Sequence, residues 1–329
     1  MKKITTNNQT DIKNINSIQD ASYYYNKLKR FFCNEKNILS IVPSGYLFLL
    51  FLIPMILMIV ISFRQAGTYG GVAPIIENIN NTLHINFTLD NFIYGLSSKF
   101  VWQLIYRSLK YSIITTVLCL ILGYPLAFLI ANSKKKYRDF LLLLIIIPFW
   151  SCFLIRVYAW MIILGPQSYI NSFMNHIFNI LHVHTMTLLY SPIAVIICLV
   201  YINLPFMILP LYANLEKHEL SLIDAARDLG ANKFQSFIKI TAPLSLPGIL
   251  SGSALVFIPS IGMFVVPELV GNNCSLMIGN LIKQQFLQTM NWPLGSVTAI
   301  TMMLVVILIA SLIGTISRKL KVLNYDTKK

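Results

Sequence analysis

Acidic residues are scarce in this sequence: Asp and Glu number 12 against 26 Lys and Arg, and the four types together make up 12% of the 329 residues. No Asp or Glu lies in the middle of a long apolar run, where a proton-coupled pump is expected to carry one. The chain also lacks the Gly-x-x-x-x-Gly-Lys-Ser/Thr loop that holds nucleotide phosphates. The sequence therefore shows no means of its own to use ATP or a proton gradient.

Histidine and cysteine are equally sparse. The five histidines form no metal-binding spacing beyond His182 and His184, and a surface role is the simpler interpretation of that pair. The cysteines are odd in number and contain no Cys-x-x-Cys, so we interpret them as small apolar side chains: Cys33, Cys119, Cys152, Cys198 and Cys274. We expect no metal site, no catalytic residue and no enzymatic activity in this chain.

Apolar side chains are abundant, at 56% of the sequence, more than a water-soluble globule of this length needs. A helix crosses the roughly 30 Å of membrane hydrocarbon with about 20 residues. Six apolar runs reach that length: 40–63, 108–131, 140–163, 192–213, 246–267 and 294–316. We therefore predict an all-α integral membrane protein, with six transmembrane helices in a domain from 39 to 317 between polar tails 1–38 and 318–329. Because tail 1–38 precedes a run too long for a signal-peptide core, the first span is expected to stay as an anchor.

The basic excess, a formal charge of +14, is concentrated in four segments. Seven Lys or Arg lie in the N-terminal tail, four in 132–139, four in 214–245 and five in the C-terminal tail. Since positively charged connections stay in the cytoplasm, both termini and the 214–245 connection are predicted to be cytoplasmic. The charge thus indicates membrane topology, and no nucleic-acid partner is expected.

Three connections on the opposite side contain segments with helical apolar spacing. They are FVWQLIYRSLKYS at 100–112, INSFMNHIFNIL at 170–181 and GNLIKQQFLQTMNW at 279–292. We expect each to form a short amphipathic helix, the first of them at the interface before the second span. Arg156 follows Asp139 by 17 residues. It is therefore expected about 25 Å along a continuous third span, near the outer interface.

Proline recurs inside the predicted spans, at Pro148, Pro205, Pro210 and Pro259. Proline kinks a helix and frees backbone carbonyls, which a membrane tolerates where neighbouring helices or a water-filled cavity satisfy them. Several kinked spans together favour a moving pathway over a static anchor.

The connection 214–245 contains a short polar helix between two apolar spans. Ser221 and Asp224 form a start similar to a capping box, and Gly230 can adopt the left-handed conformation that ends a helix. Ala225 and Ala226 place small side chains on this helix, which lets a partner surface come close to its backbone. On these features alone, a docking helix for another protein and an ordinary amphipathic loop helix remain open alternatives.

The order of residues in this connection resembles a family signature. Asp-Ala-Ala at 224–226, three residues, Gly230, nine residues, Ile240 and then Pro243 is similar to the Glu-Ala-Ala segment of ABC importer permeases, the binding-protein-dependent transport family. Asp224 replaces the family's Glu, and Ala242 replaces its Leu. In that family the segment is a coupling helix that sits in a cleft of the ATP-hydrolysing subunit. The resemblance implies a type I importer (MetI-like) fold and a coupling role for Ser221, Asp224, Ala225, Ala226, Gly230, Ile240 and Pro243.

Further stretches resemble the polyamine branch of this family, the spermidine/putrescine permeases: GYPLAFLIA at 123–131, IIPFWSCFLIRVYAW at 146–160, LPFMILPLYANLE at 204–216 and LMIGNLIKQQFLQTMNWPLGS at 276–296. The resemblance extends from about residue 40 to 320. It implies a multi-pass protein of the bacterial inner membrane that forms half of a translocation pathway. The implied partners are a cytoplasmic ABC ATPase dimer that uses the ATP, a second permease subunit, a polyamine-binding protein outside the cytoplasm, and membrane lipid; no cofactor is expected on this chain.

A polyamine carries several ammonium groups on methylene chains, so its path is expected to offer aromatic faces and a few carboxylates. The predicted pathway residues are Trp150, Tyr158, Trp160, Tyr201 and Phe264, with Glu268 at the outer mouth of the fifth span as the acidic candidate. Interface belts also use Trp and Tyr, and a carboxylate at a loop end can simply be solvated. Met263, where many relatives have Glu, favours spermidine. A permease for another small organic solute and a secondary carrier are the alternatives.

Overall fold

The computed structural model describes residues 35–74, 76–79, 82–85, 87–180, 188–217 and 225–326. The chain divides into two units, Met1–Val60 and Ile61–Lys329. The described part of the first unit is helix α2 (Glu35–Ser62), which ends two residues into the second unit and contains Pro43 and Pro54. All other elements belong to the second unit.

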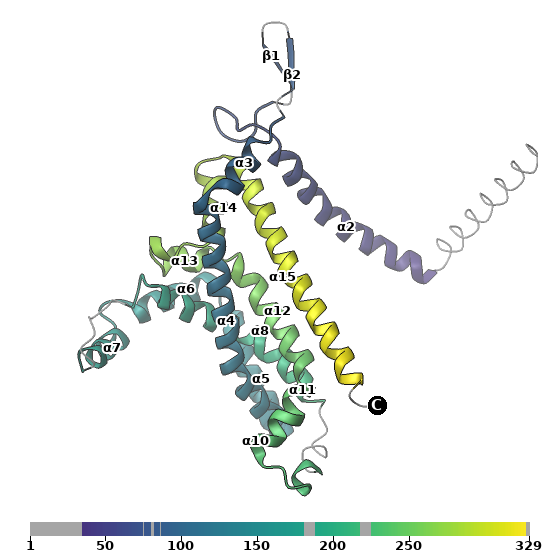
Figure 1. Ribbon diagram of the computed structural model, residues 1–329. Helices are drawn as coiled ribbons and strands as arrows, with labels where there is room; N and C mark the ends of the chain where they lie inside the picture. Colours follow the sequence, from purple (N-terminus) through teal and green to yellow (C-terminus); the bar gives the residue numbers. More distant parts are fainter. Residues whose placement is uncertain are drawn as a thin grey trace, which may run out of the picture. The chain divides into compact units, whose positions relative to one another are not determined.

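Three long helices of the second unit pack against one another: α4 (Lys99–Ala131), α8 (Pro192–Leu215) and α12 (Leu246–Ile261). Figure 1 shows α4 and α12 running side by side, with α8 behind them. Helix α8 begins where Ser191 accepts a hydrogen bond from the backbone N–H of Ala194 and Pro192 occupies the first turn. Both residue types favour a helix start, since they satisfy or remove an otherwise unpaired N–H.

Glycines let α8 approach both neighbours closely. A Cβ added to Gly252 of α12 would lie 2.9 Å from Sδ and 3.1 Å from the carbonyl oxygen of Met207. A Cβ on Gly123 of α4 would lie 3.1 Å from Cγ of the same methionine, and one on Gly248 would lie 2.8 Å from Cβ of Asn214. Met207 is fully buried between the two glycine-bearing helices. Small residues at such positions are the usual means by which membrane helices pack tightly.

The core consists of three groups of buried side chains. One joins α6 (Phe153–Leu164), α8 and α13 (Val265–Leu269); a second joins α4, α8 and α12; a third joins α4, α12, α14 (Ile278–Lys283) and α15 (Trp292–Asp326). Cys119 and Cys198 are buried free thiols within this core, as expected for small apolar side chains, whereas Cys152 is exposed.

The segment predicted as a continuous third span, 140–163, is interrupted in the structure. Helix α5 (Lys135–Ile146) passes into a 3-10 turn, η1 (Ile147–Trp150), and α6 begins only at Phe153. Pro148 lies in the first turn of η1, where its missing N–H cannot continue the α-helical ladder. Arg156 therefore lies in the first turn of α6, and the prediction that placed it far along an unbroken helix was wrong.

The connection into the fifth span also bends. Helix α10 (Lys233–Ser236), a π-helical turn η2 (Phe237–Thr241) and helix α11 (Ala242–Leu244) form an arm that meets α12 at 64°. Pro243 and Pro247 lie in the first turns of α11 and α12, where a proline is tolerated, and Ser245 stands between the two helices. At the other end α12 stops at Ile261. The predicted span 246–267 is therefore interrupted at 262–264, and its last residues lie in the short helix α13.

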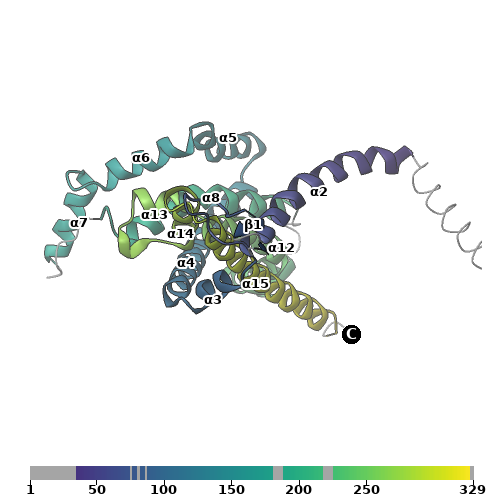
Figure 2. The same cartoon turned by 90° about the horizontal axis from the view of Figure 1, so that it is seen from above.

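The outer connections are partly helical. Segment 100–112, predicted as a separate interfacial helix, is instead the first third of the 33-residue α4. A helix of that length measures about 50 Å, more than the hydrocarbon thickness, so it carries the amphipathic turns beyond the membrane as an extension of the span. The other two predicted helices are confirmed as α7 (Tyr169–Ile180) and as α14 with the π-helical turn η4 (Gln284–Gln288). In Figure 2, α5, α6 and α7 follow one another in one direction.

The first outer connection also contains β1 (Ile76–Ile79) and β2 (Thr82–Ile85), which pair antiparallel with Ile76 opposite Ile85. Helix α3 (Asp90–Ser97) follows and packs against α15. A 3-10 turn, η3 (Asn273–Ser275), links α13 to α14.

Five segments within the described ranges are long and apolar enough to cross a membrane: Pro43–Ser62, Lys99–Ala131, Phe153–Phe173, Pro192–Leu215 and Trp292–Ser311. The bent pair Lys233–Leu244 and Leu246–Ile261 makes a sixth if it counts as one span. The chain is thus a helical, multi-pass membrane protein, as the apolar runs predict.

Candidate functional sites

The predicted coupling helix is described from residue 225 onward, and Ser221 and Asp224 lie outside the described residues. Residues 225–228 are helical, and Gly230 has a φ of 85°, the left-handed conformation predicted for it. The N–H of Gly230 donates to the carbonyl of Arg227, and the N–H of Ala231 donates to that of Ala226. These two bonds form a Schellman motif, so the helix has a defined end at Gly230.

A second short helix follows directly and is capped by its own side chains. The N–H of Gln235 donates to Oδ1 of Asn232 at 2.8 Å, and the N–H of Asn232 donates to Oε1 of Gln235 at 3.1 Å. This is a capping box, which fixes where α10 begins. This cap was not predicted, although its spacing, Asn-x-x-Gln, is visible in the sequence. Ile240 is half-buried in η2, and Pro243 is exposed in α11.

The surface of this segment is partly apolar. Leu229 is 90% exposed and Phe234 is 71% exposed, on either side of the Gly230 turn. Ala225 is exposed as well, and Ala226 is half-buried. We name residues 225–244 the coupling segment. Its exposed apolar side chains and small alanines give it a surface on which another protein can pack.

One residue of the bundle contacts the coupling segment and the hinge that follows it. The hydroxyl of Tyr124 on α4 lies 3.0 Å from Oγ of Ser245, and its ring makes an edge contact with Phe237 at a centroid distance of 5.4 Å. Ser245 is fully buried at the bend between α11 and α12. Tyr124 therefore connects α4 to both halves of the bent connection. Tyr124 was not predicted from the sequence, because its partners lie more than 100 residues away along the chain.

An ion pair also joins the start of α5, after the second span, to the end of α8. Nη1 of Arg138 on α5 lies 2.7 Å from Oε1 of Glu216, and the side chains are 21% and 39% exposed. The two residues belong to the two basic connections 132–139 and 214–245, so the pair fastens these connections together.

The predicted aromatic residues are brought together only in part. Trp160 of α6 and Tyr201 of α8 make an edge contact, with ring centroids 5.4 Å apart. Trp150 and Tyr158 are 78% and 50% exposed, so both lie on the surface of this unit. Phe264 is 38% exposed and lies just before α13, more than 60 residues after Tyr201 in the sequence.

A second aromatic pair, Phe149 and Phe206, lies beside Arg156, which was predicted to lie near the outer interface. The guanidinium carbon of Arg156 lies 5.2 Å from the ring centroid of Phe149. The Phe149 ring in turn makes an edge contact with Phe206 of α8, at 5.2 Å between centroids. Phe149 lies in η1, and Arg156 lies in α6 beyond the break.

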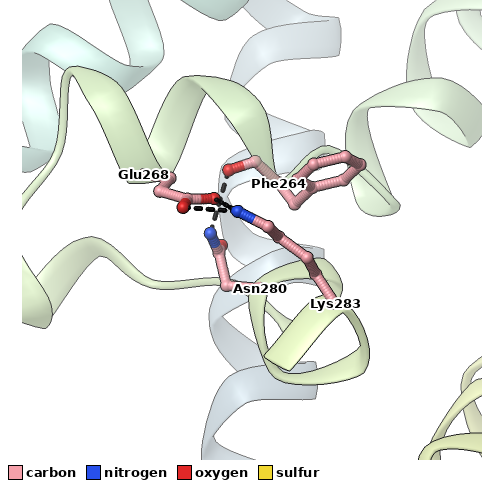
Figure 3. Close-up of polar contacts among 4 residues, drawn as sticks. All are labelled: Phe264, Glu268, Asn280 and Lys283. Carbon is pink, nitrogen blue, oxygen red and sulfur yellow. Dashed lines mark hydrogen bonds and ion pairs between the residues drawn. The ribbon is translucent and has the colours of Figure 1, made fainter. Parts of the chain in front are cut away.

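Glu268, the predicted acidic candidate, forms an ion pair with Lys283 (Figure 3). Nζ of Lys283, on α14, donates to Oε1 at 2.6 Å and to Oε2 at 2.8 Å. The same Nζ lies 5.8 Å from the ring centroid of Phe264. Asn280, one turn before Lys283, donates from Nδ2 to the carbonyl of Phe264 at 2.9 Å and accepts from the N–H of Met277 at 3.0 Å. Two predicted pathway residues, Phe264 and Glu268, therefore lie on either side of one ammonium group. That group belongs to Lys283, which was not predicted from the sequence.

Comparisons with known proteins agree with this architecture. The family model described as binding-protein-dependent transport system inner membrane component matches residues 123–322. The chain is 40% identical over 292 residues to the spermidine/putrescine transport system permease protein PotB of Haemophilus influenzae, covering 88% of this chain and 95% of that protein. It is 44% identical over 219 residues to PotB of Escherichia coli, covering 67% and 78% of the two chains.

The fold is similar to that of a chain in the crystal structure of a bacterial alginate ABC transporter in complex with an alginate pentasaccharide-bound periplasmic protein. The TM-score is 0.59 at 17% identity, covering 90% of this chain and 97% of that chain. Such low identity shows the fold alone, whereas the family match covers most of the chain, including the coupling segment. The chain belongs to the binding-protein-dependent transport system inner membrane component family, as a multi-pass permease subunit of an ABC transporter.

Proposed function

We propose that this permease forms half of the translocation pathway of an ATP-driven importer for polyamines such as spermidine and putrescine. The observation that carries the substrate class is the similarity to spermidine/putrescine permeases, at 40% identity across 88% of this chain. The chemistry of the Glu268 region supports it, because a carboxylate beside an aromatic ring suits an alkylammonium ion.

The transport cycle is proposed to be alternating access. Helix α12 begins beside α11 of the coupling segment, and α13, which contains Glu268, follows its other end (Figure 1). A movement of the coupling segment is thereby passed to the helix that ends beside the candidate cation site. The aromatic pair Trp160 and Tyr201, with Trp150 and Tyr158, is proposed to line the way past α6 and α8.

The force is proposed to come from a dimer of cytoplasmic ABC ATPases, which bind and hydrolyse the ATP. Their contact is proposed to be the coupling segment together with Ser221 and Asp224, and to include Ala225, Ala226, Gly230, Ile240 and Pro243. The exposed Leu229 and Phe234 support this assignment, since both are large apolar side chains on a polar connection. The positively charged connections place this side in the cytoplasm.

Two further partners are proposed. A second permease subunit completes the pathway, and a soluble binding protein delivers the polyamine to the outer connections. A preference for spermidine over putrescine is proposed from Met263, which stands where many relatives have Glu.

Reconstitution tests the proposal. The permease is purified with its second permease subunit, ATPases and binding protein, and incorporated into liposomes. The expected result is ATP-dependent uptake of labelled spermidine, weaker uptake of putrescine and none of a neutral amino acid. Uptake of the amino acid in preference to both polyamines would show another solute as substrate, and uptake without ATP would show a secondary carrier.

A further inference from the structure

Lys283 occupies the position in which a substrate ammonium is expected. Its Nζ lies within 2.8 Å of both carboxylate oxygens of Glu268 and 5.8 Å from the Phe264 ring centroid. The Glu268 and Lys283 side chains are 38% and 27% exposed, so the pair is open at the surface of this unit. Figure 3 shows the lysine reaching from α14 to the carboxylate on α13, with the ring of Phe264 on its other side.

The lysine side chain has the same chemistry as the substrate of the proposed function. It is a chain of four carbons that ends in a primary ammonium, which is also the terminal arm of putrescine and one arm of spermidine. A carboxylate and an aromatic face that bind the lysine ammonium can therefore also bind a terminal ammonium of a polyamine. While Lys283 is bound, however, the site has no net charge and its two acceptor oxygens are occupied.

The helices do not need this ion pair to stay together. Asn280 is 9% exposed and already links α14 to the carbonyl of Phe264, at 2.9 Å. A partly exposed ion pair adds only about 0–1 kcal/mol to stability. The pair is therefore weak enough for another ammonium to replace Lys283 without loss of the local fold.

The backbone next to Lys283 departs from a regular α-helix. The π-helical turn Gln284–Gln288 begins directly after it. Such turns interrupt the regular ladder and occur frequently at functional sites. The lysine thus lies at the junction of a regular helix and a wider turn.

Resting on the proposed function, we propose that Lys283 is a tethered competitor for the Glu268 and Phe264 site. A terminal ammonium of the polyamine displaces it to bind, and its return displaces the polyamine. Lys283 in this way lowers the affinity of the site and speeds release, which a transporter needs more than tight binding. It is a specificity-determining residue, because a solute without an ammonium cannot exchange with it.

The test is equilibrium binding of labelled spermidine to the complex of permeases and ATPases without the binding protein. Lys283→Met is expected to bind spermidine about two- to fivefold more tightly, the factor that corresponds to an exposed ion pair. Glu268→Gln is expected to weaken binding. Lys283→Arg keeps a cation and is expected to stay close to the parent protein. Lys99→Met removes an exposed lysine at the start of α4 and serves as the matched control.

Exchange requires that spermidine affinity rise in Lys283→Met and fall in Glu268→Gln. A merely structural ion pair predicts that both variants lose affinity equally. Spermidine acetylated on both primary amines is expected to show no gain with Lys283→Met, because it has no terminal ammonium left to exchange. Uptake by the complete transporter is expected to slow in Lys283→Met as release slows. If the parent complex imports spermidine but Lys283→Met binds it no more tightly, the competitor role is wrong and the proposed function stands. If the parent complex imports no polyamine, the proposed function itself fails.

Discussion

The hydroxyl of Tyr124 lies 3.0 Å from Oγ of Ser245, at the bend where the coupling segment meets α12. Ser245 also donates to the carbonyl of Ala242 at 2.9 Å, so it is bonded to both α4 and the coupling segment. A change in the angle of that bend would therefore strain or break the hydrogen bond between Tyr124 on α4 and Ser245. This contact suggests a route by which force on the exposed segment reaches the membrane helices.

Tyr124→Phe keeps the ring contact with Phe237 and removes only the hydroxyl. We expect uptake per ATP hydrolysed to fall by up to about fivefold, since a neutral hydrogen bond contributes about 1 kcal/mol. Ser245→Ala is expected to give a similar loss, and the double variant no greater loss than either single one. Uptake and ATPase rates of the reconstituted complex provide the measurement. Additive losses in the double variant would show that the two hydroxyls act separately.

Ala226→Trp adds a large side chain to the helix that ends at Gly230. Because a small side chain is what lets a partner approach this backbone, we expect ATPase activity to continue while polyamine uptake is lost. Reversing the charge at Asp224, as Asp224→Lys, is expected to have the same effect. Leu50→Trp, at an exposed position within the first span (α2), is the control and is expected to transport normally. Normal uptake by the two coupling variants would exclude this segment as the contact with the ATPases.

Gly230→Ala tests the left-handed end of the same helix. Its φ of 85° costs a residue with a Cβ about 1–2 kcal/mol, although nothing lies within 4 Å of the added atom. We expect faster amide hydrogen exchange over residues 225–231, with the long helices unchanged. Gly45→Ala, in α2 with equal space around it and no positive φ, is expected to leave exchange in this segment as it was. Unaltered exchange in Gly230→Ala would contradict the capped-helix interpretation.

Gly252→Val tests the close packing of α12 on α8. The new side chain meets the backbone oxygen and sulfur of Met207, at 3.1 and 2.9 Å from its Cβ. Overpacking of this kind costs about 1–3 kcal/mol, so we expect a lower melting temperature in detergent. Ala254→Val places similar bulk on the exposed side of the same helix and is expected to change stability little. Equal melting temperatures for the two variants would mean that the helices can separate at this point.

Much of the fold was accessible from the sequence because membranes impose simple rules. Apolar runs of about 20 residues predicted the spans, and basic connections predicted the topology. Gly230 was predicted to end the coupling helix, and its φ confirms this. The first outer helix was misjudged, since amphipathic spacing at 100–112 does not reveal whether a helix stops before the span or continues into it as α4.

The candidate sites were only half visible. Glu268 and Phe264 could be chosen by residue type, but Lys283 could not, because it lies 15 residues farther along the chain on another helix, α14. Tyr124 and Ser245 are farther apart still, and neither belongs to a local motif. Local rules such as caps and hydrophobic length act over a few residues and are written in the sequence, so they determined the membrane class and the helix at 225–230. The contact of Lys283 with Glu268 depends on how whole helices pack. Glycines such as Gly252 set how closely those helices approach, and the packing brings side chains together that are distant in the sequence. Only the tertiary structure decided such contacts.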